Sequence, residues 1–293
     1  MNREAVGVVM VIAAAAGFGT LAIFGKFAEA AGVNTMTLLT FRFLVGTVLL
    51  WLVLALWGRA HLLSGRNLRV ALALGVVYAG FSLLFFWGLL YVTAGVAGVV
   101  FYTYPAVVYL LSVAFLDERV SVRKLAALVC AFTGVVLVAG GDTAGIDLLG
   151  VVLVLLAGWG YAVYITGNRA VVASLEADIL AGTALVATTL VTAVFGVASG
   201  QLVVPTTVEQ WWPILGTAVL GTSLPLVLYV GSLDRIEASR AAITSTVEPV
   251  VTVLLGIIIL DEAFTLSLVG GGVLVLGGVL LIQTDPRALL DSG

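Results

Sequence analysis

Long apolar segments separated by short polar connections run through the whole chain. A transmembrane helix needs roughly 20 mostly apolar residues, and ten segments reach about that length. They cover approximately residues 5–27, 34–57, 69–90, 94–116, 121–140, 146–168, 177–198, 211–232, 237–260 and 264–283. The segments are continuous and lack the period-two alternation of membrane strands. The pattern therefore predicts an all-α integral membrane protein with ten transmembrane helices.

Composition agrees with a lipid environment. The chain is 62% apolar and 10% charged, with a mean hydropathy of +1.22, whereas about a quarter of the residues in a soluble domain are charged. So few charges cannot cover a water-facing surface, so we expect a lipid bilayer around the helices. The single cysteine, Cys130, lies in an apolar segment and excludes both an intrachain disulfide and a cysteine-based metal site.

The positions of Lys and Arg predict the orientation, because cytoplasmic loops are enriched in both. With both termini inside, the outer segments contain only Lys26, and Arg42 lies within the second helix. The inner segments then contain Arg3, Arg59, Arg66, Arg69, Arg119, Arg123, Lys124, Arg169, Arg235, Arg240 and Arg287. This asymmetry favours an N-in and C-in topology with an even number of helices.

An internal repeat divides the chain into two halves. The segment 105–118, which begins with proline and ends with Asp-Glu, returns as 249–262 with the same internal spacing. We therefore predict two five-helix repeats, residues 1–143 and 144–293. Because five is odd, the second repeat must enter the membrane from the opposite face. Such 5+5 inverted repeats build the central site of many transporters.

No set of residues typical of an enzyme is found in the sequence. It has no His-rich or Cys-rich metal set, no phosphate loop and no nucleophile motif, so we expect no catalysis, metal or cofactor. The basic loops are short and lack interleaved aromatic residues, which gives no support for nucleic-acid binding.

Two repeat-related prolines, Pro105 and Pro249, interrupt apolar helices. Proline removes a backbone hydrogen bond and kinks a helix. We expect these positions to act as hinges or to shape a cavity, and the alternative is a static bend that helps packing.

Glu248 precedes Pro249 about halfway along the ninth helix. A charge at that depth is costly, so it should face a cavity or a partner. Arg42 is the candidate partner for an ion pair. Glu248 is thus expected to recognise substrate or couple transport to protons, unless it is a structural tie to Arg42 or to the backbone.

Aromatic and hydroxyl residues concentrate at middle depth in the third, fourth, sixth, eighth and ninth helices. Tyr and Trp offer flat apolar faces with a hydrogen-bond donor, which suits an amphiphilic or aromatic solute. The set comprises Tyr78, Ser82, Phe85, Phe86, Phe101, Tyr102, Tyr104, Trp159, Tyr161, Tyr164, Thr222, Ser223, Tyr229, Thr244, Ser245 and Thr246. We expect about half of them to line a substrate path.

The chain resembles the ten-helix EamA-type branch of the drug/metabolite transporter superfamily. The resemblance rests on the two five-helix halves, on Arg42, and on Glu248-Pro249 followed by Leu260-Asp261-Glu262 and a Gly-rich last helix. The first half has Tyr104-Pro105 in place of Glu248-Pro249 and so lacks the acidic member. The aromatic lining is similar to that of YddG-type exporters of aromatic and hydrophobic amino acids.

This resemblance implies a secondary carrier of small metabolites in a bacterial inner membrane. In the family, helices 3, 4, 8 and 9 frame the cavity and helices 1 and 6 contribute to it. Carried over by position, the substrate-binding residues are Tyr78, Ser82, Phe101, Tyr102, Trp159, Ser245 and Glu248. The Asp-Glu pairs at 117–118 and 261–262 are expected to be structural and to cap the helices that follow them.

The sequence therefore predicts an exporter of amino acids or similar amphiphiles that works by alternating access. The chain contains no ATP site, so a gradient must supply any energy for export. A facilitator that moves its substrate downhill is the alternative to coupled export. An antiporter of nucleotide sugars or sugar phosphates is the alternative within transport, although it should require several cations in the cavity. The alternative from another class is a membrane scaffold that transports nothing.

Overall fold

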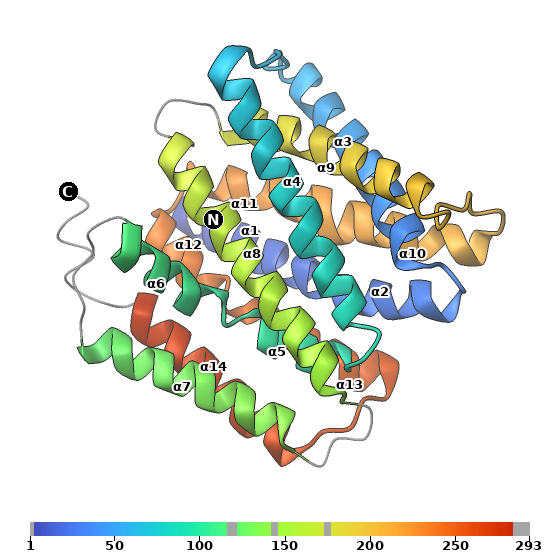
Figure 1. The fold of residues 1–293 in the computed structure, drawn as a ribbon. Coiled ribbons are helices and arrows are strands. Elements are labelled where there is room, and N and C mark those ends of the chain that lie inside the picture. The colour runs from blue at the N-terminus through green and yellow to red at the C-terminus, as the bar shows by residue number, and fades with distance from the viewer. Residues whose placement is uncertain (1–2, 116–121, 142–145, 173–176, 284–293) are drawn as a thin grey trace.

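The structure is a computed structural model that describes residues 3–115, 122–141, 146–172 and 177–283, and all regular structure in these ranges is helical (Figure 1). The continuous helices are α3 (Thr35–Leu56), α4 (Gly65–Gly88), α7 (Val122–Ala139), α8 (Leu148–Val172), α9 (Ala177–Ala198) and α14 (Leu266–Gln283). Eight spans are long and apolar enough to cross a membrane, and two shorter apolar helices, Leu125–Ala139 and Leu266–Leu281, account for the rest of the ten predicted segments. The predicted all-α class is confirmed.

Four of the predicted helices are interrupted near the middle. Their pieces are α1 (Arg3–Gly19) with α2 (Leu21–Ala30), α5 (Ala94–Phe101) with α6 (Tyr104–Phe115), α10 (Val208–Ala218) with the π-helical turn η1 (Val219–Ser223) and α11 (Leu224–Leu233), and α12 (Ala238–Thr244) with α13 (Val247–Leu260). The breaks between α5 and α6 and between α12 and α13 fall at matching positions of the two halves. Irregular backbone at membrane depth is tolerated only where protein or a water-filled cavity satisfies it.

The prolines lie at the start of new helical pieces. Pro105 is the second residue of α6, Pro225 the second of α11 and Pro249 the third of α13. Proline fits the first turn of a helix, where its missing N–H has no partner to lose. For Pro105 and Pro249, the structure thus refines the expected mid-helix kink into a break that precedes the proline.

Helices at equivalent positions of the two halves pack against each other in antiparallel pairs. Near the start of α3, Asn34 Nδ2 donates to the Gln201 carbonyl beyond the end of α9 at 2.8 Å. Near the end of α3, Trp51 Nε1 donates to the Gly182 carbonyl in the first turns of α9 at 3.1 Å. The beginning of each helix therefore meets the end of the other, as an inverted repeat requires.

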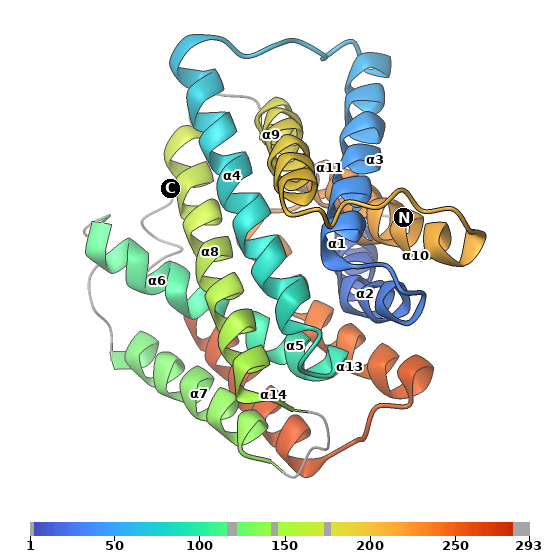
Figure 2. The same cartoon turned by 45° about the vertical axis from the view of Figure 1, so that its right-hand side comes forward.

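The second antiparallel pair, α7 with α14, lies side by side at one edge of the molecule (Figures 1 and 2). Glycines allow the two backbones to approach closely, which is how helices associate in lipid. A Cβ on Gly134 would lie 2.6 Å from the Gly271 carbonyl, and one on Gly278 would lie 2.6 Å from the Ala127 carbonyl.

The contacts of α4 also resemble those of the equivalent segment in the second half. α4 packs on α8 and α9, while the equivalent segment α10–α11 packs on α1 and α3. The contacts of α4 thus have counterparts in those of α10–α11.

Most of the described arginine contacts lie at the end of the bundle where α1 and α4 begin. Gly25 of α2 packs on Leu89, which directly follows α4, so α1 and α4 start at the same end. The contacts at this end are Arg59 with Asp178 at 2.9 Å, Arg240 with Glu4 at 3.4 Å, and Arg3 with the Asp234 carbonyl at 3.0 Å. The N-in and C-in topology remains a prediction from the Lys and Arg bias.

Glu262 does not cap the helix that follows it, contrary to expectation. Asp261 takes the left-handed conformation (φ 52°, ψ 33°), and the Glu262 N–H donates to the Gly256 carbonyl at 3.1 Å. This turn sends the Glu262 carboxylate to the first turn of α5, where it accepts hydrogen bonds from the backbone N–H groups of Ala94 and Gly95 at 2.5 and 2.9 Å. The cap of α14 is Thr265 instead. The equivalent pair at 117–118 lies outside the described residues.

Candidate functional site

Six aromatic side chains from α4, α5, α6 and α8 form one contiguous group, called here the aromatic cluster. Its members are Tyr78, Phe81, Phe101, Tyr104, Tyr161 and Tyr164. Tyr78 stacks on Phe81 with 4.8 Å between ring centroids, and Tyr161 lies 4.7 Å from Tyr104 and 5.4 Å from Phe101. The tyrosines of the cluster are only partly buried. Apolar ring surface and tyrosine hydroxyl groups are therefore both accessible at the middle of the bundle.

Helical spacing and two glycines produce this arrangement. Tyr161 and Tyr164 lie three residues apart, so both project from the same face of α8. A Cβ on Gly160 would lie 2.8 Å from the Phe81 side chain, and one on Gly158 would lie 3.2 Å from the Phe101 carbonyl. Glycine at these positions lets α8 approach α4 and α5 closely enough for the rings to meet.

Glu248 borders the aromatic cluster. It lies in the first turn of α13 and is close enough to interact electrostatically with Tyr102, Tyr104 and Tyr161. Its side chain is half-buried, and no cation of the described residues lies within ion-pair distance of it. Within the same ranges, no three His, Cys, Asp or Glu side chains gather where they could hold a metal ion.

The structure does not bring Arg42 and Glu248 together as an ion pair. Arg42 is 3% exposed, and its Nε donates to the Thr222 hydroxyl at 3.0 Å. Its guanidinium also lies over the rings of Phe43 and Phe86, at 4.8 and 5.3 Å from their centroids. Thr222 belongs to the π-helical turn η1, an irregularity that residue spacing does not reveal, so the sequence could not indicate this partner.

Four of the predicted substrate-binding residues share this region. Tyr78 and Phe101 belong to the aromatic cluster, and Glu248 lies beside it. Ser245 is partly buried at the end of α12, and its carbonyl accepts the Glu248 N–H at 3.0 Å.

Tyr102 and Ser82 are fully enclosed in this conformation, with 1% and 3% of their surface exposed. Both contribute to packing around the site rather than to an accessible surface.

Trp159 does not lie with the aromatic cluster. The residue is 55% exposed and falls on one stripe of α8 with Val152, Leu156 and Val163, which are also exposed. Its place is taken by Tyr161 and Tyr164, whose spacing puts them on another face of the helix. Sequence reasoning noticed all three residues but had no means of deciding which face of α8 turns inward.

A family model for the EamA-like transporter family matches the chain twice, over residues 5–140 and 148–284. The chain belongs to this family. As an EamA-like transporter it is a multi-pass membrane protein of the inner membrane, as the sequence predicts. The resemblance to the drug/metabolite transporter superfamily is thereby confirmed at the level of the family.

Related proteins cover nearly the same length. An "Uncharacterized transporter" of Archaeoglobus fulgidus is 28% identical, over 85% of this chain and 88% of that protein. The "Threonine/homoserine exporter RhtA" of Salmonella typhimurium is 29% identical, over 84% of this chain and 82% of the exporter. A solved crystal structure with 20% identity superposes with a TM-score of 0.67, covering 97% of this chain and 98% of its own, and shows that the fold is shared.

Proposed function

We propose that this EamA-like transporter exports amphiphilic amino acids, with a preference for aromatic and hydrophobic side chains. The observation that carries the proposal is the aromatic cluster with a carboxylate at its edge. Six rings in mutual contact give a solute a flat apolar surface, and the tyrosine hydroxyls add donors and acceptors.

Glu248 provides the polar end of the proposed site. A carboxylate without a nearby cation at membrane depth is suited to the ammonium group of an amino acid or to a proton. Either role would allow a proton gradient to drive export, because a proton and a substrate ammonium would compete for the same carboxylate. A downhill facilitator would use Glu248 for recognition alone.

The two broken helices support transport by alternating access. Pieces α6 and α13 both start near the site, each with a proline in its first turn. A break between two rigid helical pieces can absorb the dihedral changes of a hinge. We assign this role to Pro105 and Pro249, with the two inverted halves rocking around the aromatic cluster.

The relatives named for threonine and homoserine export favour a second candidate, an exporter of small polar amino acids. An antiporter of sugar phosphates has less support. Polyanionic substrates need several cations, and Arg42 is the buried cation at membrane depth within the ranges that the structure describes.

Counterflow in proteoliposomes tests the proposal directly. Vesicles preloaded with one unlabelled amino acid are assayed for uptake of labelled tryptophan, leucine, threonine, homoserine and glucose 6-phosphate. We expect the fastest exchange with tryptophan and leucine. Exchange confined to threonine and homoserine would replace the preference with the second candidate, and no exchange of any solute would reject transport of these classes.

A further inference from the structure

Arg42 is a buried cation that forms no ion pair with the residues that the structure describes. It is 3% exposed, and no carboxylate of the described residues lies within ion-pair distance of its guanidinium. A hydrogen bond to Thr222, the nearby Tyr78 hydroxyl and two aromatic rings hold the group in place. A buried guanidinium is costly unless it is paired, because both water and a compensating charge are missing. The arrangement orients the cation but leaves its charge unbalanced.

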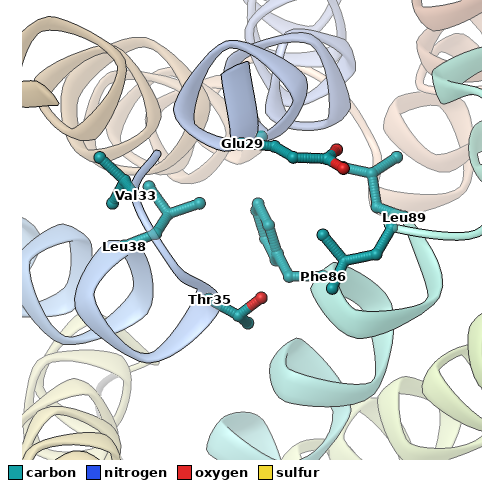
Figure 3. A pocket seen from close by; sticks show the side chains of 8 residues that line it. Glu29, Val33, Thr35, Leu38, Phe86 and Leu89 are labelled. Atoms are coloured by element: carbon teal, nitrogen blue, oxygen red, sulfur yellow. The ribbon is translucent and has the colours of Figure 1, made fainter. Parts of the chain in front are cut away.

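A hollow at the outer end of the bundle leads toward this cation. Gly25, Glu29, Val33, Thr35, Leu38, Phe86, Leu89 and Leu90 line it. Figure 3 shows the Phe86 ring projecting from α4 between Glu29 and Thr35. The same ring lies 5.3 Å from the Arg42 guanidinium. Phe86 therefore lines the hollow and contacts Arg42 with the same ring.

The aromatic cluster approaches Arg42 from another side. The Phe43 ring, which lies under the guanidinium at 4.8 Å, is 5.3 Å from the ring of Tyr78. Tyr78 itself is near enough to interact electrostatically with Arg42 and stacks on Phe81 within the cluster. Arg42 thus lies between the proposed apolar site and the outer hollow.

We propose that Arg42 is the carboxylate-recognition residue of the transporter, oriented by Thr222 and completed by the carboxylate of the amino acid that is carried. The assignment rests on the proposed function. A planar guanidinium with several donors matches a carboxylate in two parallel hydrogen bonds. The substrate would place its side chain in the aromatic cluster, its carboxylate at Arg42, and leave past Phe86 through the outer hollow.

Ligand-dependent thermal unfolding of the purified full-length protein tests this assignment without transport. The probes are L-tryptophan and L-tryptophanamide, which differ in the carboxylate alone, and the matching pair L-threonine and L-threoninamide. A charge-assisted pair contributes about 10- to 100-fold in affinity. We expect the wild type to be stabilised at correspondingly lower concentrations of the carboxylate than of the amide, and Arg42→Met to respond to both alike.

The two proposals fail in different ways. A carboxylate preference for threonine alone, lost in Arg42→Met, supports the role of Arg42 and rejects the preference for aromatic side chains. Equal responses of the wild type to acid and amide in both pairs, including no response to either, overturn the role of Arg42. A carboxylate preference that survives in Arg42→Met overturns it as well.

If Arg42 had a structural role instead, Arg42→Met would lower the unfolding temperature of the unliganded protein. Removing an uncompensated buried charge should leave the unfolding temperature of the unliganded protein unchanged or higher. If Arg42→Met does not fold, Arg42→Lys keeps the charge but loses the planar fork. A folded Arg42→Lys protein with a reduced preference for the carboxylate supports the assignment, and one with the wild-type preference contradicts it.

Discussion

At the scale of single residues, Glu248 and Arg42 carry charge deep within the bundle and have different surroundings. Glu248 has tyrosines beside it and retains accessible surface, whereas Arg42 is enclosed by aromatic rings and bonded to Thr222. A half-buried carboxylate can exchange protons or bind an ammonium group. An enclosed guanidinium stays charged, so its role is restricted to binding an anionic group that reaches it. Under the proposed function, Glu248 would bind the ammonium group and Arg42 the carboxylate of the same amino acid.

Replacing Glu248 with an isosteric amide tests proton coupling. We expect Glu248→Gln to flatten the dependence of counterflow on pH, because the amide does not titrate. The matched control is Glu209→Gln, which alters an exposed carboxylate near the end of the bundle and should keep the wild-type profile. An unchanged flux and an unchanged pH profile in Glu248→Gln would remove the coupling role.

The aromatic cluster can be tested with two aromatic residues of the same helix. Tyr161 contacts Phe101 and Tyr104, while Trp159 faces outward with 55% of its surface exposed. Aromatic contacts of this kind contribute about 0.5–1.5 kcal/mol each. We expect Tyr161→Ala to raise the KM for tryptophan counterflow about tenfold and Trp159→Ala to leave it unchanged. The reverse order of effects would contradict the placement of α8.

At the scale of elements, glycine and short caps decide how the helices meet. The Glu262 carboxylate from the second half caps α5 of the first, and a Cβ on Gly256 would lie 2.5 Å from its Oε2. This contact joins the two halves at the end of the bundle where α5 begins. It requires the left-handed turn at Asp261, a conformation that Asp and Asn tolerate better than most residues.

We expect Glu262→Ala to lower the free energy of unfolding by about 1–2 kcal/mol, since α5 loses its cap. Gly256→Ala should destabilise the protein through the same contact by displacing the carboxylate. Asp261→Asn is the control and should be nearly neutral. Denaturant unfolding in detergent micelles measures all three, and a neutral Glu262→Ala would refute the cap.

The seam between α7 and α14 makes a second prediction at this scale. A Cβ on Gly134 meets the Gly271 backbone, whereas one on Gly277 has nothing within 4 Å. We expect Gly134→Ala to destabilise the protein, and Gly277→Ala to be neutral or to stabilise it by up to about 1 kcal/mol because alanine favours helices. Equal stabilisation by both would show that the two helices do not approach closely.

At the scale of the whole molecule, the two halves pack as antiparallel counterparts around one aromatic site. Each repeat supplies one broken helix to the centre and one helix to each antiparallel pair. In such a bundle, one half can rock against the other and open the site to the opposite side, with little change in the contacts within each half. That property is what alternating access requires.

Cysteine labelling tests the orientation. In a Cys130→Ser background, His61→Cys and Val204→Cys place single thiols at exposed positions on opposite ends of the bundle. We expect an impermeant maleimide added to intact cells to label Val204→Cys and not His61→Cys, and inside-out vesicles to give the opposite. Labelling of His61→Cys from outside would overturn the N-in topology.

Hydrophobicity and composition were sufficient to predict the helical class and the number of apolar segments. Each segment that crosses lipid must be apolar and must satisfy its own backbone hydrogen bonds. These properties can therefore be predicted from each segment of the sequence alone. Helix rotation could not be read in this way. In a membrane both faces of a helix are apolar, so no polar face marks the outside, and the sequence did not show that Trp159 lies on an exposed stripe of α8.

The amino-acid sequence by itself determined that the chain crosses the membrane as helices, that its halves are related, and that Glu248 and Arg42 lie within apolar segments. The tertiary structure alone decided their partners: Thr222 for Arg42, tyrosines for Glu248, and α5 for Glu262. These contacts join residues that lie far apart in the sequence, 180 positions apart for Arg42 and Thr222 and 167 for Gly95 and Glu262. Their geometry depends on local irregularities, a π-helical turn and a left-handed residue, and on close approaches at glycine, none of which apolar periodicity encodes.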